Sequence, residues 1–284
     1  MKYRYLRFPE GREKAVTFSY DDGNKSDIRL AEIFSSYGMK CTFNITARGR
    51  TNPALLTTEE GFEHILGKEH EIALHGAEHR ALGAARAIDG IREILDCRLY
   101  LEKEYGRIIR GYAYSDFGIA RYFNGASYES VRSYLSDLDI AYARALGELN
   151  SDFTLPTDWL RWHPNAHHDN ADIFEKIDKF LAIKVSEGYV ASRYPRLLYI
   201  WGHSFEFDNK DNWNRITEIC EKLSGKDDIW YATNMEIYEY VTAYNSLVYS
   251  ADGLRVYNPT LKTIWFDVDG VLYSIAPGEE LIIG

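Results

Sequence analysis

The apolar and polar positions of the chain follow two spacings in turn, one typical of buried strands and one typical of helices. Strands are predicted where apolar residues run almost continuously, at 15–20, 41–45, 72–74, 108–109, 140–142, 197–201 and 229–231. Helices are predicted where apolar residues recur three and four positions apart, at 26–37, 57–66, 84–105, 117–136, 171–183, 213–223 and 235–243. Thr57 and Glu60 have the spacing of a capping box, and Gly106 is a stop signal after the long helix pattern.

Strand-then-helix units that repeat in this way indicate an α/β fold with a parallel sheet covered by helices. About seven such units fit a closed or nearly closed barrel better than a short open sheet, and such barrels gather their chemistry at the carboxyl ends of the strands. From residue 247 the helical spacing stops, and short β-rich runs alternate with turn signals such as Asp252-Gly253 and Asp269-Gly270. We therefore expect a barrel at 1–246 and a small antiparallel β appendage at 247–284.

The composition is that of a globular protein, with 284 residues of which 45% are apolar and 27% charged. The formal charge of −10 argues against binding to nucleic acid or to an anionic membrane, because both need clusters of Lys and Arg. No apolar stretch reaches the ~18 residues of a membrane span. The N-terminal residues lack the apolar core of a secretory leader, so we expect a cytoplasmic protein. Three scattered cysteines favour buried thiols over a disulfide framework.

The most informative polar residues directly follow two predicted strands. Asp21 and Asp22 follow the first strand, and His75 and His79 follow the third. One carboxylate plus two imidazoles is a set of three ligands for a divalent ion, and a second carboxylate beside them suits a general base. Two other interpretations stay open. Asp21-Asp22-Gly23 could be a turn and helix cap beside a solvated helix that carries the histidines, or the ligand set could belong to a non-haem iron site.

Other polar residues carry weaker patterns. His203 follows the apolar run at 197–201 and could be a general acid, with Asp158 as a buried partner and Trp159 as an apolar wall. Arg110 follows a predicted strand and could hold Asp21 through a charge-assisted contact. Each of these residues has an ordinary structural explanation as well, namely a hydrogen-bonded histidine or a surface arginine.

A second group of histidines lies in an irregular stretch of the chain. It consists of His163, His167 and His168, with Asp169 beside them. This group suits a second metal site, a loop that contacts the substrate, or a structural loop, and the spacing alone does not decide between these alternatives.

Taken in order, these residues resemble the motifs of the polysaccharide deacetylases, the NodB-like carbohydrate esterases. The five segments are Ser19-Tyr20-Asp21-Asp22-Gly23, His75-x-x-x-His79, Arg110, Asp158-Trp159 and Ile200-x-x-His203. The resemblance covers roughly residues 12–245. It implies a distorted (β/α)7-type barrel and hydrolysis of acetyl groups on sugars with one divalent ion. That ion would be zinc, with cobalt, nickel or manganese as alternatives.

The resemblance also implies a role for each matched residue. Asp21 would be the base, Arg110 would orient Asp21, His203 would be the acid and Asp158 would orient His203. The metal ligands would be Asp22, His75 and His79. Trp159 and Tyr112 would line the substrate site, with a backbone N–H near Tyr112 helping to stabilise the oxyanion.

Two positions depart from the family pattern. Gly76 stands where serine or threonine is usual, and no proline follows in Arg110-Gly111-Tyr112-Ala113-Tyr114.

We expect a metal-dependent hydrolase that removes N- or O-linked acetyl groups from an acetylated mono- or oligosaccharide. The alternatives are a hydrolase of another linear amide or cyclic imide on the same fold, and a non-catalytic carbohydrate-binding protein.

Overall fold

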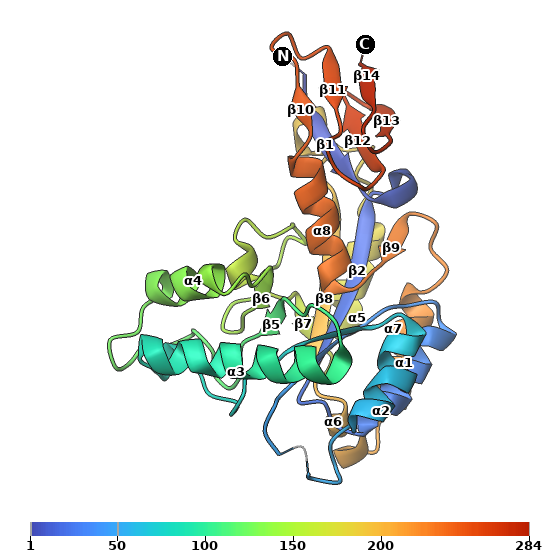
Figure 1. Cartoon of the computed structure of the whole chain (residues 1–284). Helices are drawn as coiled ribbons and strands as arrows, with labels where there is room; N and C mark the ends of the chain where they lie inside the picture. The colour runs from blue at the N-terminus through green and yellow to red at the C-terminus, as the bar shows by residue number, and fades with distance from the viewer. Residues whose placement is uncertain (1, 50, 284) are drawn as a thin grey trace.

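A curled parallel sheet forms the centre of the molecule (Figure 1). The structure is a computed structural model that describes residues 2–49 and 51–283. The strands lie in the order β6-β5-β4-β3-β2-β8-β7, and β9 also pairs with β2. The expected parallel strand–helix fold is thus confirmed. The strands are β2 (Lys14–Asp21), β3 (Thr42–Ile45), β4 (Glu71–Leu74), β5 (Gly111–Ala113), β6 (Tyr142–Arg144), β7 (Ala166–His167), β8 (Arg196–Gly202) and β9 (Ile229–Tyr231).

Strand β2 is the central strand of this sheet. Strand β8 pairs with one edge of β2 while β3 and β9 share the other, and all residues of β2 are buried because the core packs against both of its faces. A strand buried on both faces needs no alternation of polar residues, which explains its continuous apolar run. The sheet curls until one segment joins its two edges. Trp162 bridges to Arg144 at the end of β6, and β7, a few residues further on, pairs with β8.

Helices cover the outside of the curled sheet. In Figure 1, α3 and α4 lie side by side on one flank of the barrel. The α-helices are α1 (Ser26–Ser36), α2 (Thr58–Glu60), α3 (Ala87–Tyr105), α4 (Tyr128–Asp137), α5 (Ile173–Ala182), α6 (Phe205–Asn209), α7 (Asn214–Leu223) and α8 (Asn234–Asn245). A π-helical turn (Gly61–Ile65) continues α2, and short 3-10 turns lie at Pro9–Gly11, Leu66–Lys68, Leu82–Ala84, Trp159–Arg161 and Val190–Ser192. None of the described helices is long and apolar enough to cross a lipid bilayer.

Some predicted elements are displaced in the structure, and some short ones were not predicted. The strand expected at 108–109 is β5, three residues later, and Ile108 is 77% exposed. The helix expected at 117–136 begins only at Tyr128, because Gly118 and Gly125 adopt positive φ before it and Ser127 caps its first turn. Strand β7 and helix α6 are too short to produce a recognisable period.

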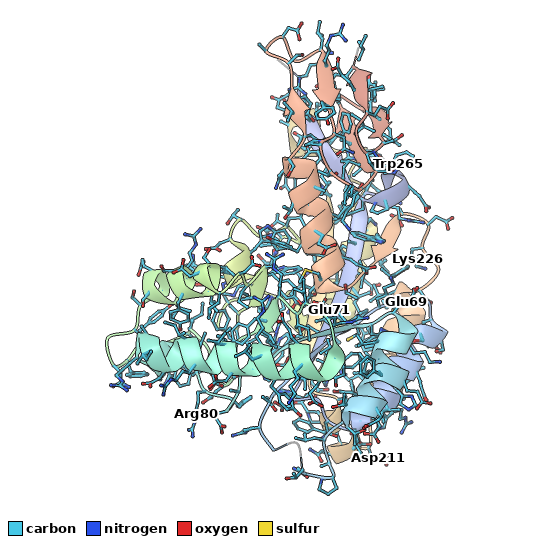
Figure 2. The ribbon with its side chains drawn as sticks, in the orientation of Figure 1. Glu69, Glu71, Arg80, Asp211, Lys226 and Trp265 are labelled. Carbon is cyan, nitrogen blue, oxygen red and sulfur yellow. The ribbon has the colours of Figure 1, made fainter. Side chains whose placement is uncertain are left out.

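The C-terminal residues form the expected antiparallel appendage, which packs on α8. Its strands are β10 (Val248–Tyr249), β11 (Arg255–Tyr257), β12 (Ile264–Val268), β13 (Val271–Ile275) and β14 (Glu280–Ile282). The N-terminal strand β1 (Arg4–Arg7) pairs with β12 beside Trp265, so the appendage also takes a strand from the segment expected in the barrel (Figure 2). Asp269 and Gly270, both with positive φ, form the two-residue turn between β12 and β13.

Candidate metal centre and active site

The side chains of Asp22, His75 and His79 converge at the carboxyl ends of β2 and β4. Asp22 Oδ1 lies 3.6 Å from His75 Nε2 and 3.5 Å from His79 Nε2, and the three donor atoms lie within 4.8 Å of one another. Zinc ligands, each at about 2.0–2.2 Å from the ion, lie roughly 3.3 Å apart in a tetrahedral site. The structure therefore brings together the three residues predicted as ligands, in an arrangement that fits a divalent ion.

The backbone conformation and one backbone carbonyl orient these side chains. Asp22 and His79 have φ values of 81° and 58°, in a region that costs a residue other than glycine about 1–3 kcal/mol. His75 Nδ1 lies 2.9 Å from the carbonyl oxygen of Ala113, so Nδ1 carries the ring proton. The Nε2 atom that faces Asp22 then keeps its lone pair, which is the tautomer that a metal ligand needs. Burial also lowers the pKa of His75, which favours the neutral ring.

Asp21 lies beside these ligands and is almost fully buried. Arg144 Nη2 donates to Asp21 Oδ2 at 2.5 Å, and Asn44 Nδ2 donates to Oδ1 at 2.8 Å. Burial raises the pKa of Asp21, but the charge of Arg144 and the hydrogen bond from Asn44 help to hold it below the ordinary value. Asp21 is therefore ionised at neutral pH, as a general base must be.

Arg144 occupies the position that the sequence assigned to Arg110. Arg110 precedes β5, so it lies at the opposite end of the sheet, where its Nη2 pairs with Asp139 Oδ1 at 2.7 Å on the surface. Arg144 ends β6, is fully buried, and lies with its guanidinium 4.6 Å from the centre of the Trp201 ring. A signal for Arg144 existed in the sequence, since it follows the strand predicted at 140–142 as the other site residues follow theirs.

His203 directly follows β8, at the same end of the sheet as the ligands. Its Nδ1 lies 3.4 Å from Glu206 Oε1, three residues later at the start of α6. Burial lowers the pKa of His203, but the contact with Glu206 and the charges of Asp21 and Asp22 outweigh burial and place the pKa above its ordinary value. His203 is thus suited to carry a proton near neutral pH.

Asp158, which the sequence paired with His203, lies elsewhere. Its carboxylate accepts hydrogen bonds from the hydroxyl of Tyr128 at 2.5 Å and the N–H of Leu160 at 3.0 Å. Asp158 therefore caps the short turn that follows it, and Glu206 takes the place predicted for it beside His203. Sequence analysis missed Glu206, although its spacing of three residues from His203 places both on one helical turn.

The two aromatic residues predicted to contact the substrate pack in the protein core instead. Trp159 is half-buried and packs edge-on against Trp162 and against Tyr238 of α8, with ring centres 4.9 and 5.3 Å apart. The Tyr112 ring is fully buried within the barrel. The nearby N–H of Tyr114 donates to the carbonyl of Arg144 at 3.0 Å, so the sheet already uses this donor.

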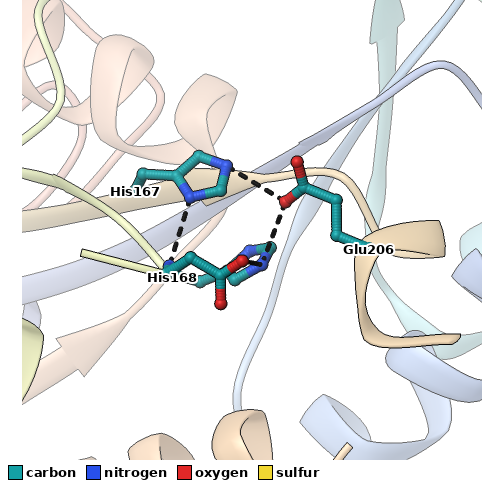
Figure 3. A group of neighbouring side chains, drawn as sticks. His167, His168 and Glu206 are labelled. Atoms are coloured by element: carbon teal, nitrogen blue, oxygen red, sulfur yellow. Dashed lines mark hydrogen bonds and ion pairs between the residues drawn. The ribbon is translucent and has the colours of Figure 1, made fainter. Parts of the chain in front are cut away.

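A second cluster of histidines and acids surrounds Glu206 (Figure 3). Glu206 Oε2 lies 3.2 Å from His167 Nε2 and 3.1 Å from His168 Nε2, and Asp169 lies 3.5 Å from His168. His163, which the sequence grouped with these residues, lies apart from them and faces Glu148 at 3.7 Å. The four clustered donors lie within 4.8 Å of one another, so distance alone would also allow a metal.

The contacts in this second cluster favour a network of ion pairs within the protein over a metal site. The backbone N–H of Asp169 donates to His167 Nδ1 at 3.1 Å, so in the neutral ring the proton lies on Nε2, the atom that faces Glu206. Asp169 already pairs with two cations, Lys210 and Arg215. Burial raises the pKa of Glu206, but its contacts with three histidines depress it far below the ordinary value.

Two hollows meet beside the candidate metal ligands. One, of about 710 Å³, is bordered by the loop that carries His79 and by the first turns of α3. The other, of about 400 Å³, is lined by Asp22, Asn24 and Phe205, and both hollows share Arg48 and His79. Volumes of about 300–1,000 Å³ are typical of sites for small molecules, so a ligand has room on both sides of His79.

The family model described as "Polysaccharide deacetylase" matches residues 8–143, just under half of the chain. The matched segment contains the aspartate pair and both histidine ligands, and it confirms the predicted resemblance there. Arg144, His203 and Glu206 lie beyond it. A comparison with curated protein sequences gives no match.

Solved structures share the fold at low sequence identity. A putative polysaccharide deacetylase from Mycobacterium smegmatis has a TM-score of 0.55 at 16% identity, over 86% of this chain and 96% of that one. The Xyl-CE4 domain of a multidomain xylanase from the hindgut metagenome of Trinervitermes trinervoides has a TM-score of 0.51 at 13% identity, over 81% and 92%. The chain covers 55% of the Streptococcus pyogenes deacetylase PplD, at 19% identity over 46% of this chain and a TM-score of 0.41. The first two of these structures show that the fold is that of the NodB-like deacetylases.

Proposed function

Since residues 8–143 match the polysaccharide deacetylase family, we propose that this protein is a metal-dependent hydrolase that removes acetyl groups from a carbohydrate. One observation carries the proposal. Asp22, His75 and His79 point their donor atoms at a common position, and the ionised Asp21 lies beside them. A ligand set with an adjacent free carboxylate is the arrangement that hydrolysis of an amide or ester needs.

Asp22, His75 and His79 would hold the divalent ion, and zinc suits this mixed nitrogen and oxygen set. When bound, such an ion polarises the acetyl carbonyl and makes a water more acidic. The tautomer of His75 is already the one that ligation requires, because its Nδ1–H donates to Ala113. The protein therefore needs no rearrangement of this ring before it takes up the ion.

The base and the acid of the reaction come from two neighbouring strands, since Asp21 ends β2 and His203 follows β8. Asp21 removes the proton from the water that attacks the acetyl carbon, and Arg144 and Asn44 hold this carboxylate in place. His203 gives its proton to the departing amine or hydroxyl oxygen as the bond to the acetyl carbon breaks. Glu206 fixes the ring of His203 and favours its protonated form.

The substrate would be an acetylated mono- or oligosaccharide that occupies the hollows on both sides of His79. Together these hollows have room for sugar units beyond the one that carries the acetyl group. Their linings mix polar side chains with the apolar surfaces of Phe117 and Phe205, as the alternating polar and apolar faces of a sugar require.

A direct test measures acetate release from a panel of N- and O-acetylated mono- and oligosaccharides. We expect release by the native protein, loss of release after chelation, and recovery when zinc or cobalt is added back. The Asp21→Asn variant should bind the ion and release almost no acetate, whereas Arg110→Ala should behave like the native protein. Release that survives chelation, or that survives in Asp21→Asn, would contradict the proposal. Linear amides and cyclic imides in the same panel test the other hydrolase activity.

A further inference from the structure

The loop that carries His79 is wrapped around one buried acid, Glu93 of α3. Glu93 is 5% exposed, and its Oε1 accepts the N–H of Glu78 at 3.0 Å and the N–H of Arg80 at 2.9 Å. Its backbone carbonyl accepts a third N–H, that of Ala77, at 2.9 Å. His79 thus lies between two residues whose backbone is tied to the same carboxyl group. Figure 2 shows Arg80, the residue after His79, beside α3.

These contacts hold a backbone that would otherwise be costly. His79 has a φ of 58°, which an L residue other than glycine seldom adopts without support. The bonds to Glu78 and Arg80 restrain the peptides on both sides of this residue. The direction of the His79 ring, and with it the position of Nε2 relative to Asp22, therefore depends on Glu93.

Gly76 makes room for this carboxyl group. A Cβ atom at position 76 would lie 2.4 Å from Glu93 Oε1 and 3.1 Å from Ser115 Oγ, and the φ of 85° is itself unfavourable for a side chain. A serine or threonine here would therefore meet the atom that accepts the loop's hydrogen bonds. Ser115, from the loop after β5, supplies a hydroxyl to this region instead and donates to the carbonyl of His75 at 2.6 Å.

We propose that Glu93 is a positioning residue for the metal ligand His79, and that Gly76 is required because Glu93 occupies the space beside it. The inference rests on the proposed metal site and deepens it. Residues that orient metal ligands through hydrogen bonds change metal affinity by about 10–100-fold when they are removed. Glu93 acts without touching the ion, through two backbone amides.

The first experiment measures zinc affinity of the full-length, metal-free chain by competition with a chelating dye. We expect Glu93→Ala to bind zinc about 10–100-fold more weakly than the native chain. Glu93→Gln, which keeps one acceptor oxygen, should lie between the two. Asp89→Ala is the matched control, because this acid lies one turn earlier on α3 and pairs with Arg86 on the surface. It should keep the native affinity.

The second experiment tests the contact between positions 76 and 93 and needs no activity. Gly76→Ser should weaken zinc binding, and it should do so less in the Glu93→Ala background, because the clash with Oε1 is then gone. Hydrogen exchange in the metal-free native chain should show protected amides at Glu78 and Arg80, which covers the case in which a Glu93 variant fails to fold.

The outcomes separate this inference from the proposed function. Native zinc affinity in folded Glu93→Ala, or fast exchange at both amides, overturns the positioning role and leaves the metal site standing. Equal effects of Gly76→Ser in the two backgrounds overturn the role assigned to Gly76. A native chain that binds no divalent ion overturns both proposals together.

Discussion

The two histidine clusters of this protein contain the same kinds of side chain, but the backbone forms opposite hydrogen bonds with them at Nδ1. In the first, His75 Nδ1 donates to a carbonyl oxygen, so its Nε2 has a free lone pair. In the second, His167 Nδ1 accepts a backbone N–H, so its Nε2 carries the proton in the neutral ring. The first ring is ready to bind a cation and the second is ready to donate to a carboxylate.

The charges around the clusters follow the same division. Asp169 of the second cluster pairs with Lys210 and Arg215, so two cationic side chains already balance its negative charge. Among the residues that the structure describes, Asp22 forms its ion-pair contacts with His75 and His79. Residue type and distance do not distinguish the two clusters; the hydrogen-bond partners and the neighbouring charges do.

The largest expected effect comes from exchanging the equivalent histidines for alanine. His75→Ala should lose the zinc that we propose the native chain binds, and with it the proposed deacetylase activity, because it removes a ligand. His167→Ala should keep one ion per chain. Metal analysis after dialysis against zinc measures both variants. Two ions bound to the native chain, one of them lost in His167→Ala, would show that the second cluster also binds metal.

The next effect concerns the free acid beside the first cluster. Asp21→Asn should lower kcat by about 10²–10⁴-fold, the usual contribution of a general base, and leave the metal content unchanged. Steady-state kinetics with metal analysis of the same sample checks this. If Asp21→Asn lost its ion, Asp21 would be a metal ligand, and its assignment as the general base would be wrong.

The two candidate arginines should differ in their effect on stability. Arg144→Ala leaves Asp21 buried without its cation, a change that typically costs about 3–5 kcal/mol in the free energy of unfolding. Arg110→Ala removes a surface pair with Asp139, for which about 0–1 kcal/mol is typical. Urea unfolding of both variants measures the difference. Equal losses would mean that Arg144 is not the partner on which Asp21 depends.

The smallest effect tests how the second cluster serves the first. Glu206→Gln removes an ion-pair contact to His203, for which about 1 kcal/mol, or roughly 5-fold in kcat, is typical. Glu206 raises the pKa of His203, so its loss lowers that pKa. Activity that needs protonated His203 should then decline at a lower pH on the alkaline side. An unchanged pH profile would separate the two clusters functionally.

The sequence by itself determined the candidate ligands and the end of the sheet at which they lie. Asp22 and His75 directly follow β2 and β4, and parallel strands bring their carboxyl ends to one edge of the sheet. The hydrophobic pattern identified these strands because each is buried along most of its length. The appendage followed in the same way from its short runs and turn residues, as at Asp269-Gly270.

Only the tertiary structure decided which arginine meets Asp21, which acid meets His203 and which histidine keeps the lone pair of Nε2 free. Arg144 and Asp21 are 123 residues apart, and β5, three residues from its expected place, put Arg110 at the wrong end of the sheet. The tautomer of His75 depends on a carbonyl of β5, a different strand. Such contacts depend on how distant segments pack, and no local spacing of residue types records them.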